Sequence, residues 1–355
     1  MIARDDLRAA VGSGLISEKQ AADLVSLADS RRGARENLNP GDEPFELFKG
    51  FNEIFIVIGL IILAFGWSGV ASLILGGQII DLTRYAVSVA LIGAAMLWLL
   101  SEYFVRKRRM VAPAIALSVM FAGNAVFGFL AAMMQPFMVA QNDYSSVPLP
   151  LFFATLTLAV YWWRFRVPFA MAMIAVGLFA VAIVFAASRG GRVDDISDFF
   201  LLSAGGPFAF ITLAPGIVVF AVAMTFDMSD PHRVTRRSAN GFWLHVVAAP
   251  ALVNTVALTL LDRDTFGANV ILLGFLTLFA LIAIVIDRRS FLIAAIGYIV
   301  ALAATVMDGD GAALTVLILG IILLLLGAFW ERIRARILRL MPGFVPLHRL
   351  PPSQV

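Results

Sequence analysis

Long apolar runs alternate with short polar segments from about residue 54 to residue 330. Each run holds sixteen or more mainly apolar residues, close to the ~20 that a helix needs to cross a hydrocarbon core of ~30 Å. The pattern predicts ten transmembrane helices: Ile54–Leu75, Tyr85–Tyr103, Val111–Met134, Pro148–Trp163, Val167–Ala187, Phe208–Phe226, Gly241–Leu261, Ala268–Ile286, Phe291–Val306 and Ala313–Trp330. We therefore expect an all-α, polytopic integral membrane protein.

The first fifty residues are polar and predict a small helical hairpin with a linker. One short helix is expected over Arg4–Val11 and a second over Ser17–Arg32, separated by a break at Gly12-Ser13-Gly14. Ser17 and Gln20 have the spacing of a capping box at the start of the second helix. An apolar stripe at helical spacing follows, and we expect it to pack on the neighbouring helix, on the membrane domain or on a partner. The stripe consists of Ala21, Leu24, Val25 and Ala28.

The chain is thus predicted to have three parts. Residues 1–50 form a cytoplasmic hairpin and linker, residues 51–330 a ten-helix transmembrane domain, and residues 331–355 a basic cytoplasmic tail. The arginines of this tail are expected to meet anionic lipid headgroups of the inner leaflet. The first fifty residues lack a basic segment followed by an apolar one, so no cleaved signal peptide is predicted.

Basic residues are sorted to one side of the predicted membrane. With the N-terminus inside, 23 of the 27 Lys and Arg residues fall in the N-terminal region, the internal loops and the tail. The predicted external loops hold the other four, which are Arg84, Arg189, Arg192 and Arg263. Because the Lys/Arg bias sets orientation, both termini are predicted to be cytoplasmic. The sorted charge points to the lipid bilayer as the partner, and no nucleic-acid partner is predicted.

Composition and motifs argue against catalysis. The chain is 61% hydrophobic and 14% charged, and it has no cysteine, which excludes disulfides and thiolate chemistry. It contains no G-x-S-x-G, no H-E-x-x-H and no aspartate pair inside a predicted span. The sequence predicts a protein that is not an enzyme and that uses neither a cofactor nor a metal.

The predicted span Gly241–Leu261 carries more hydrogen-bonding side chains than any other span, including the only histidine in the predicted spans, His245. A buried imidazole needs a partner, and Glu53 and Glu102 at the inner ends of the first two spans are the expected candidates. We hypothesise that His245 faces the bundle interior. The alternative is a histidine that a backbone carbonyl or a lipid headgroup satisfies.

Two asparagines complete the set of candidate substrate-binding residues. Asn254 lies on the same span as His245, and Asn124 lies on the third span, where a hydrogen bond between helices is the alternative role. Small residues recur every four positions on the second and third spans, which favours close helix packing. They are Ala86, Ala90 and Ala94, and Ala114, Ser118 and Ala122.

Three short stretches carry a family resemblance: Gly14-Leu15-Ile16-Ser17-Glu18-Lys19-Gln20, Gly50-Phe51-Asn52-Glu53, and Trp243-Leu244-His245 with Pro250. The chain resembles a family of uncharacterised bacterial multi-pass membrane proteins that join an N-terminal hairpin of the form G-[IL]-[IL]-[ST]-x-x-Q to a bundle of many spans. The resemblance implies a bacterial cytoplasmic (inner) membrane and transfers no catalytic residue.

Two functions stay open. The first is transport of a small molecule or lipid, for which ten spans that divide into five and five permit an inverted repeat. The second is a non-transporting membrane scaffold or sensor that docks a cytoplasmic protein partner through the hairpin. A polar cavity at mid-membrane would favour transport, and a closed apolar bundle would favour the scaffold or sensor. The sequence predicts neither the cargo nor the oligomeric state.

Overall fold

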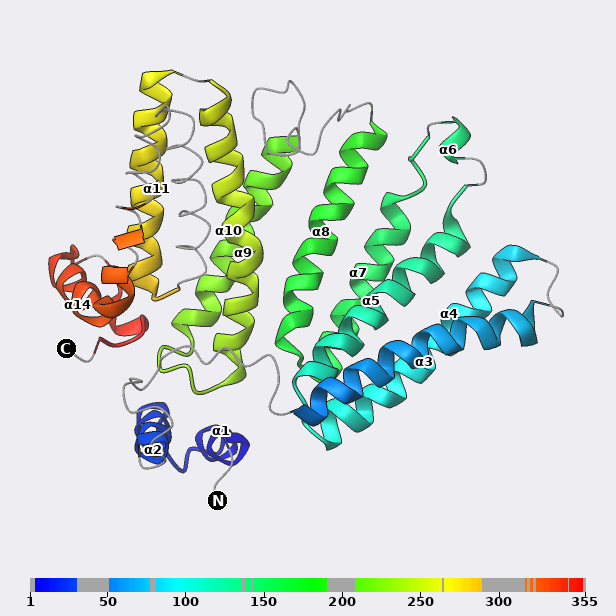
Figure 1. Cartoon of the computed structure of the whole chain (residues 1–355), viewed down its shortest axis with the longest axis horizontal. Helices are drawn as coiled ribbons and strands as arrows, with labels where there is room; N and C mark the ends of the chain where they lie inside the picture. The colour runs from blue at the N-terminus through cyan, green and yellow to red at the C-terminus, as the bar shows by residue number, and fades with distance from the viewer. Residues whose placement is uncertain are drawn as a thin grey trace. The chain divides into compact units, whose positions relative to one another are not determined.

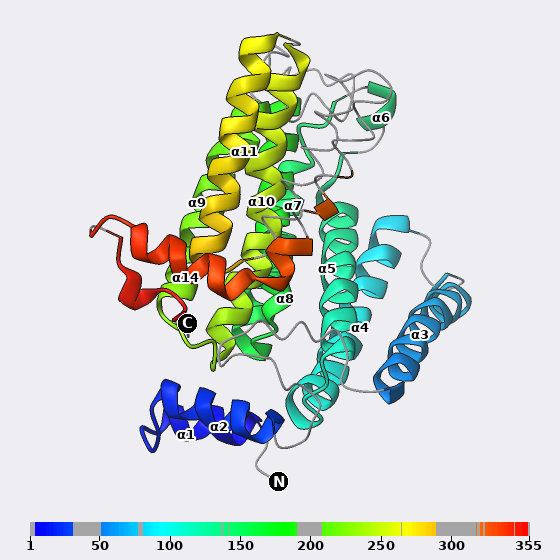
Figure 2. The same ribbon diagram turned by 60° about the vertical axis from the view of Figure 1, so that its left-hand side comes forward.

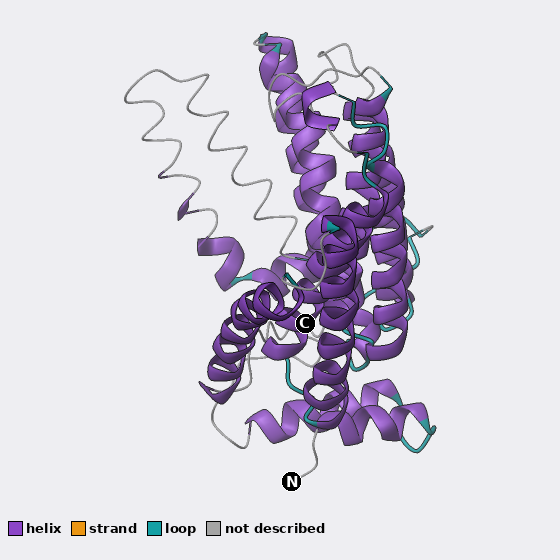
Figure 3. Ribbon diagram, turned by 90° about the vertical axis from the view of Figure 1, so that its right-hand side faces the viewer, coloured by secondary structure: helices purple, strands orange, loops and turns teal. Residues whose placement is uncertain are grey.

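The computed structural model describes residues 4–30, 51–76, 81–135, 138–141, 143–189, 208–263, 265–288, 317, 320–321, 324–343 and 345–353. All regular structure in these ranges is helical (Figure 3), which confirms the all-α prediction. The chain forms two compact units. We call Pro44–Asp194 with Gly206–Ile211 the α3–α8 unit, and Met1–Glu43, Asp195–Gly205 and Thr212–Val355 the α9–α14 unit.

The α3–α8 unit is built from long apolar helices joined by short turns (Figure 1). Its elements are α3 (Phe51–Leu75), α4 (Leu82–Ser101), a π-helix (Glu102–Lys107), α5 (Ala112–Met133), α6 (Met138–Gln141), α7 (Pro148–Phe165) and α8 (Pro168–Ser188). Asp81 caps α4 by accepting from the backbone N–H groups of Thr83 and Arg84. Proline stands in the first turn of α5, α7 and α8, where its missing N–H costs nothing.

The α9–α14 unit holds the N-terminal hairpin and the remaining helices. Its elements are α1 (Arg4–Gly12), α2 (Glu18–Ser30), α9 (Phe208–Met228), α10 (Arg236–Asp262), α11 (Phe266–Ile286), α14 (Trp330–Leu340) and a 3₁₀ turn (Leu347–Arg349). Helices α10 and α11 pack together, and α14 lies across one end of α11 (Figure 2).

Seven helices within the described ranges are long and apolar enough to cross a membrane, so the protein is a multi-span helical membrane protein. They correspond to the first, second, third and fifth to eighth predicted spans. The fourth predicted span is present as α7, but its polar, tryptophan-rich end keeps it below the apolar character of the seven. The ninth predicted span lies outside the described residues, as does most of the tenth. Charge sorting predicts which end of each helix faces the cytoplasm. We call these ends the inner ends.

Small residues let α4 and α5 approach closely, as their spacing predicted. Ala86 and Ala90 on α4 and Ala114 on α5 are buried. A Cβ placed on Gly128 of α5 would lie 2.7 Å from the Cβ of Ala90, so only glycine fits at this crossing. Helix α5 also packs on α3 and α7, and α7 packs on α8 (Figure 1).

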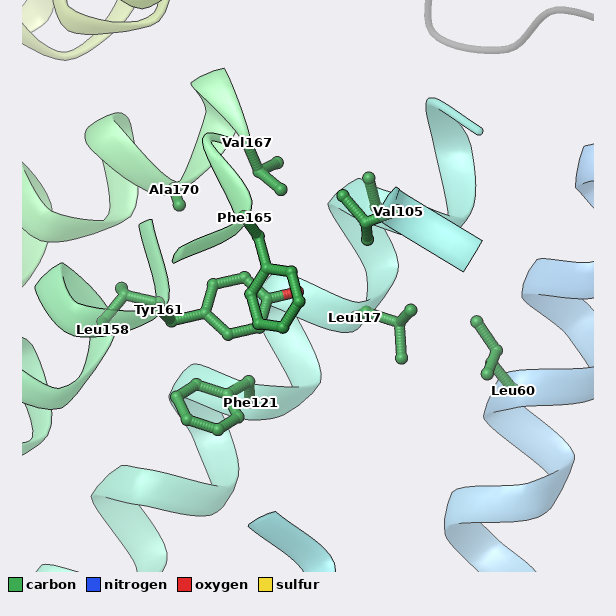
Figure 4. Packing of buried hydrophobic residues seen from close by; sticks show 10 residues of the cluster. Leu60, Val105, Leu117, Phe121, Leu158, Tyr161, Phe165, Val167 and Ala170 are labelled. Carbon is green, nitrogen blue, oxygen red and sulfur yellow. The ribbon is translucent and has the colours of Figure 1, made fainter. Parts of the chain in front are cut away.

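Aromatic side chains fill the core of the α3–α8 unit near its inner end (Figure 4). The rings of Phe121 and Tyr161 stack with centroids 4.7 Å apart, and Phe165 lies 4.6 Å from Tyr161. The Tyr161 hydroxyl is 2.9 Å from the Ser101 Oγ, which itself donates to the carbonyl of Leu97. This contact satisfies the buried hydroxyl of Tyr161.

The hairpin confirms the predicted capping box, and part of the predicted apolar stripe is buried. The Ser17 N–H donates to Gln20 Oε1 at 2.9 Å, and the Gln20 N–H donates to Ser17 Oγ at 3.2 Å. Ala21 of the predicted stripe is buried and Leu24 is 46% exposed, so the partner that would cover Leu24 stays a prediction.

Candidate functional site

His245 lies in the interior of the α9–α14 unit with no exposed surface, which agrees with the hypothesis that it faces inward. Its Nε2 is 2.9 Å from the Oδ2 of Asp227. Its ring also makes an edge contact with Phe220, with ring centroids 5.4 Å apart. The histidine therefore has a carboxylate partner within the protein.

A third ionisable group completes this cluster. The Arg288 guanidinium binds Asp227 in bidentate fashion, with Nε 3.0 Å from Oδ2 and Nη2 2.5 Å from Oδ1. Its Nη2 also donates to the Ser238 carbonyl at 3.0 Å. We call Asp227, His245 and Arg288 the buried triad, because each of the three is at most 3% exposed.

Local structure brings these three side chains to one place. Asp227 stands in the last turn of α9, and His245 stands in the third turn of α10. A Cβ on Gly241 of α10 would lie 2.2 Å from Asp227 Oδ1. Glycine is thus required at this position for the carboxylate to approach α10.

The turn between α9 and α10 is held by a second aspartate. Asp230 accepts from the backbone N–H groups of Val234 and Thr235 at 3.1 and 2.9 Å, and from the Thr235 hydroxyl at 2.7 Å. Burial raises the pKa of Asp230 above its usual range, and the hydrogen bonds from Thr235 oppose this rise. Thr235 in turn caps α10.

Arg288 reaches the triad because α11 ends in a left-handed residue. Asp287 has φ of 56° and ψ of 48°, and the next N–H, from Arg288, returns to the Ala283 carbonyl at 2.9 Å. This is the usual way in which a helix ends and reverses direction, although glycine is the commoner residue there. Burial lowers the pKa of Arg288 to about 9, so the guanidinium stays protonated at neutral pH.

The carboxylate of Asp287 holds a neighbouring cluster at the inner end of α11. Arg233 Nη1 lies 3.0 Å from Asp287 Oδ2, and Trp330 Nε1 donates to Oδ1 at 2.7 Å. Arg334 of α14 is 1% exposed and donates through Nε to the Ile284 carbonyl at 3.1 Å. The guanidinium thereby satisfies a carbonyl of the last helical turn, where a positive charge is favoured.

The charges of the triad compensate one another. Asp227 and Arg288 form a pair whose hydrogen bonds are charge-assisted, and the Nε2–H of His245 donates to the same ionised carboxylate. In a buried pair, removal of one partner typically costs about 3–5 kcal/mol because the other charge is left uncompensated. The triad can therefore join the inner ends of α9, α10 and α11, and separating these ends requires that the pair be broken.

The threonines of α10 lie further along the same helix pair. The Thr255 hydroxyl is 3.1 Å from that of Thr212 on α9 and donates to the Ala251 carbonyl at 2.7 Å. Thr259 donates to the Thr255 carbonyl, also at 2.7 Å. The interface of α9 and α10 thus carries buried polar contacts at two levels.

The two candidate asparagines do not join His245. Asn254 is half-buried and lies nine positions further along α10, about 13 Å along the helix axis at 1.5 Å per residue. Asn124 belongs to the α3–α8 unit, where its Nδ2 donates to the Ala90 carbonyl at 2.8 Å. For Asn124 this is the hydrogen bond between helices that was the alternative to ligand binding.

The expected carboxylate partners of His245 were wrong. Glu53 accepts from the N–H groups of Val111 and Ala112 at 3.2 and 2.9 Å, and Glu102 pairs with Arg106 and Arg164. The partner in the structure, Asp227, directly follows the predicted sixth span, Phe208–Phe226. One sequence feature could have identified this pair. Asp227 and Arg288 each border a predicted span, and both lie on the same predicted side of the membrane.

The described residues contain no group of three or more histidines and carboxylates that could hold a metal ion. Comparison with protein-family models, with curated proteins and with solved structures finds no match for this chain. The structure confirms the class of protein that the resemblance implies, a multi-span helical membrane protein. The particular family is not confirmed.

Proposed function

We propose that this protein is a transporter of a small solute, in which the buried triad closes the inner side of a pathway along α9 and α10. The observation that carries the proposal is the burial of Asp227, His245 and Arg288 at the inner ends of three helices. Ionisable groups within membrane helices are costly and commonly belong to a transport or proton pathway. The triad supports this role because a solute or proton that competes for Asp227 would release Arg288.

Paired helix interruptions support the same proposal. Pro215 lies inside α9 and Pro250 lies inside α10, and each removes one backbone hydrogen bond from its helix. Next to Pro215, Gly216 packs against Ala251 and Leu252, since a Cβ on this glycine would lie 3.2 Å from side-chain atoms of both. The two interruptions therefore meet at one level of the helix pair, where bending is easiest.

We extend the proposal to the number of spans, their orientation and the membrane that holds them. We propose ten spans in a bacterial cytoplasmic membrane, both termini in the cytoplasm, and no catalytic activity; the charge sorting supports the orientation. The tail is proposed to contact anionic lipids, because α14 buries Arg334 and leaves Arg332, Arg336 and Arg339 exposed.

A second candidate, a membrane sensor, rests on how the hairpin docks. Arg8 of α1 donates through Nε to the Val234 carbonyl at 3.2 Å, in the turn that joins α9 to α10. Glu18 of α2 lies in the field of Asp230, His232 and Arg237 from the same turn. A cytoplasmic partner that displaced the hairpin would therefore act directly on the turn beside the triad.

Cysteine accessibility tests transport without knowledge of the solute, because the chain has no cysteine of its own. In Thr255→Cys, the thiol replaces a fully buried side chain at the α9–α10 interface. If α9 and α10 line a pathway, a membrane-impermeant maleimide should label this thiol from one side of the membrane, and adding Asp227→Asn should raise labelling from the inner side.

Exposed and lipid-facing positions provide the controls. Ser13→Cys and Ser145→Cys should label from opposite sides, which also tests the topology, and Val270→Cys on the exposed face of α11 should stay unlabelled. If Thr255→Cys resists labelling from both sides with and without Asp227→Asn, the transport proposal fails and the sensor becomes the better candidate.

A further inference from the structure

The inner end of the α3–α8 unit carries a concentrated positive charge that neither the triad nor the hairpin uses. Residues 102–109 and 164–166 contain six basic side chains and one carboxylate, a net charge of +5. We call these six residues the arginine rim: Arg106, Lys107, Arg108, Arg109, Arg164 and Arg166. Five of them are exposed and Arg164 is half-buried, so the charge is available at the surface.

One carboxylate organises the rim. Glu102 Oε2 lies 2.9 Å from Arg106 Nη1, and Glu102 Oε1 lies 2.7 Å from Arg164 Nη2. This bridge ties the π-helix that follows α4 to the end of α7, and it gathers basic residues from two loops into one surface. Glu53, which accepts from the N–H groups of Val111 and Ala112, is a second carboxylate at this end. The six cations of the rim outnumber these two carboxylates, so the rim keeps a net positive charge.

The backbone of the rim adopts conformations that arginine does not favour. Arg109 and Arg166 have φ of 52° and 53°, in the left-handed region where glycine is the ordinary residue. The Arg166 N–H donates to the Trp162 carbonyl at 2.7 Å, which fixes the turn after α7. Arginine therefore stands at two turns that glycine would form with less strain.

Aromatic rings place the rim at the depth of lipid headgroups. Lys107 Nζ lies 5.7 Å from the ring centre of Tyr103, and the Arg166 guanidinium lies 4.8 Å from that of Trp162. Trp163, next to Trp162, is 66% exposed on a membrane-spanning helix bundle. Tyrosine and tryptophan concentrate at the boundary between hydrocarbon and water, so the neighbouring cations lie level with phosphate groups.

We propose that the arginine rim is a binding site for the phosphate group of an anionic phospholipid. Arginine matches phosphate because its planar guanidinium donates two parallel hydrogen bonds to phosphate oxygens. Basic clusters between the ends of membrane helices bind such headgroups by the same chemistry. The exposed apolar face of α7, with Val160 about one turn from the rim, would contact the acyl chains of the bound lipid.

Site-specific fluorescence quenching in vesicles tests this proposal with the full chain. A fluorophore is attached to Val160→Cys, and vesicles of phosphatidylcholine contain an increasing fraction of brominated phosphatidylglycerol or, for comparison, brominated phosphatidylcholine. We expect brominated phosphatidylglycerol to bind beside this reporter roughly tenfold or more tightly than the zwitterionic lipid. The variant R108Q/R109Q/R166Q should lose that preference.

A charge-matched variant and a second reporter separate the site from a general charge effect. R84Q/R189Q/R263Q removes three exposed arginines from the predicted external side and should keep the preference, and a reporter at Val270→Cys should show none. Competition by millimolar inorganic phosphate would identify a free phosphate as the ligand and overturn the lipid assignment. Equal quenching by both lipids in the unmodified chain, or a preference that survives in R108Q/R109Q/R166Q, would also overturn it.

Discussion

The α9–α14 unit buries two of the arginines at its inner end, whereas the α3–α8 unit buries none of those that the structure describes there. In the α3–α8 unit most of these arginines are exposed and surround a half-buried carboxylate, and the core behind them is aromatic. In the α9–α14 unit Arg288 and Arg334 are each 1% exposed and bind carboxylates or helix-end carbonyls. The sorting of positive charge therefore predicts which side of the membrane a helix end faces. It does not predict whether an arginine there is exposed to lipid headgroups or buried in a hydrogen-bonded ion pair.

The reason for the difference lies in what each helix end offers. Asp227 and Asp287 provide buried carboxylates at the ends of α9 and α11, and the last carbonyls of α11 accept further hydrogen bonds from arginine. Glu102 offers a single half-exposed carboxylate at the end of α4. Exposed ion pairs contribute little to stability, and broken buried pairs cost much more.

The largest effect is expected where one partner of the buried pair is removed. Asp227→Ala leaves the Arg288 guanidinium buried without its carboxylate and should lower the free energy of unfolding by about 3–5 kcal/mol. Glu102→Ala in the other unit should lower it by about 0–1 kcal/mol, because that pair is exposed to solvent. The measurement is equilibrium unfolding of the purified protein in mixed detergent micelles.

A double variant distinguishes an uncompensated charge from a general loss of packing. Asp227→Ala combined with Arg288→Met removes both charges and should recover much of the lost stability, since an apolar replacement of a buried pair is often well tolerated. If Asp227→Ala and Glu102→Ala lowered the free energy of unfolding equally, burial of the ion pair would not explain the stability of the α9–α14 unit's inner end.

Glycine substitutions give the next largest contrast. Gly241→Ala would place its Cβ 2.2 Å from Asp227 Oδ1, so the carboxylate must move away from Arg288; we expect a loss of about 1–3 kcal/mol. Gly123→Ala on α5 meets nothing within 4 Å and should gain about 0.5–1 kcal/mol, because alanine suits a helix better. The same unfolding measurement compares them, and a stabilising Gly241→Ala would contradict the tight approach of α9 and α10.

Helix positions were largely predictable from the sequence because bilayer thickness and hydropathy constrain them directly. The predicted spans Val111–Met134 and Val167–Ala187 match α5 and α8 to within one residue at each end. Helix α10 begins at Arg236, five residues before the predicted Gly241. Its polar first turn is capped by Thr235, so hydropathy alone placed the start too late.

The candidate site was only half predictable. Hydrogen-bonding capacity singled out His245, and the need to satisfy a buried imidazole required a partner. The identity of that partner depends on how α9 and α11 end, which brings positions 227, 245 and 288 together from three separate helices. No spacing rule along one chain encodes this meeting, whereas the capping box of Ser17 and Gln20 is local and was correct.

The smallest expected effect concerns the hairpin of the α9–α14 unit and its dependence on pH. Partial burial, followed by the nearby Asp230, raises the pKa of Glu18 above its ordinary value of 4.5, while His232 and Arg237 oppose the rise. A carboxyl whose pKa is raised in the docked state binds a proton more readily when docked than when free. Docking should therefore be strongest below about pH 4.5 and should weaken as the pH rises through the raised pKa.

Distances between two spin labels can measure this docking in the otherwise cysteine-free chain. Labels on Leu24→Cys and Ser229→Cys, both exposed, should show a docked distance whose population falls as the pH rises above 4.5. The change should be small because Glu18 is only partly buried. Glu18→Gln cannot ionise, so it should keep the docked population constant over the same pH range. If the unmodified and Glu18→Gln chains respond identically to pH, another group controls the docking, and the buried charges of this unit do not extend their influence to the hairpin.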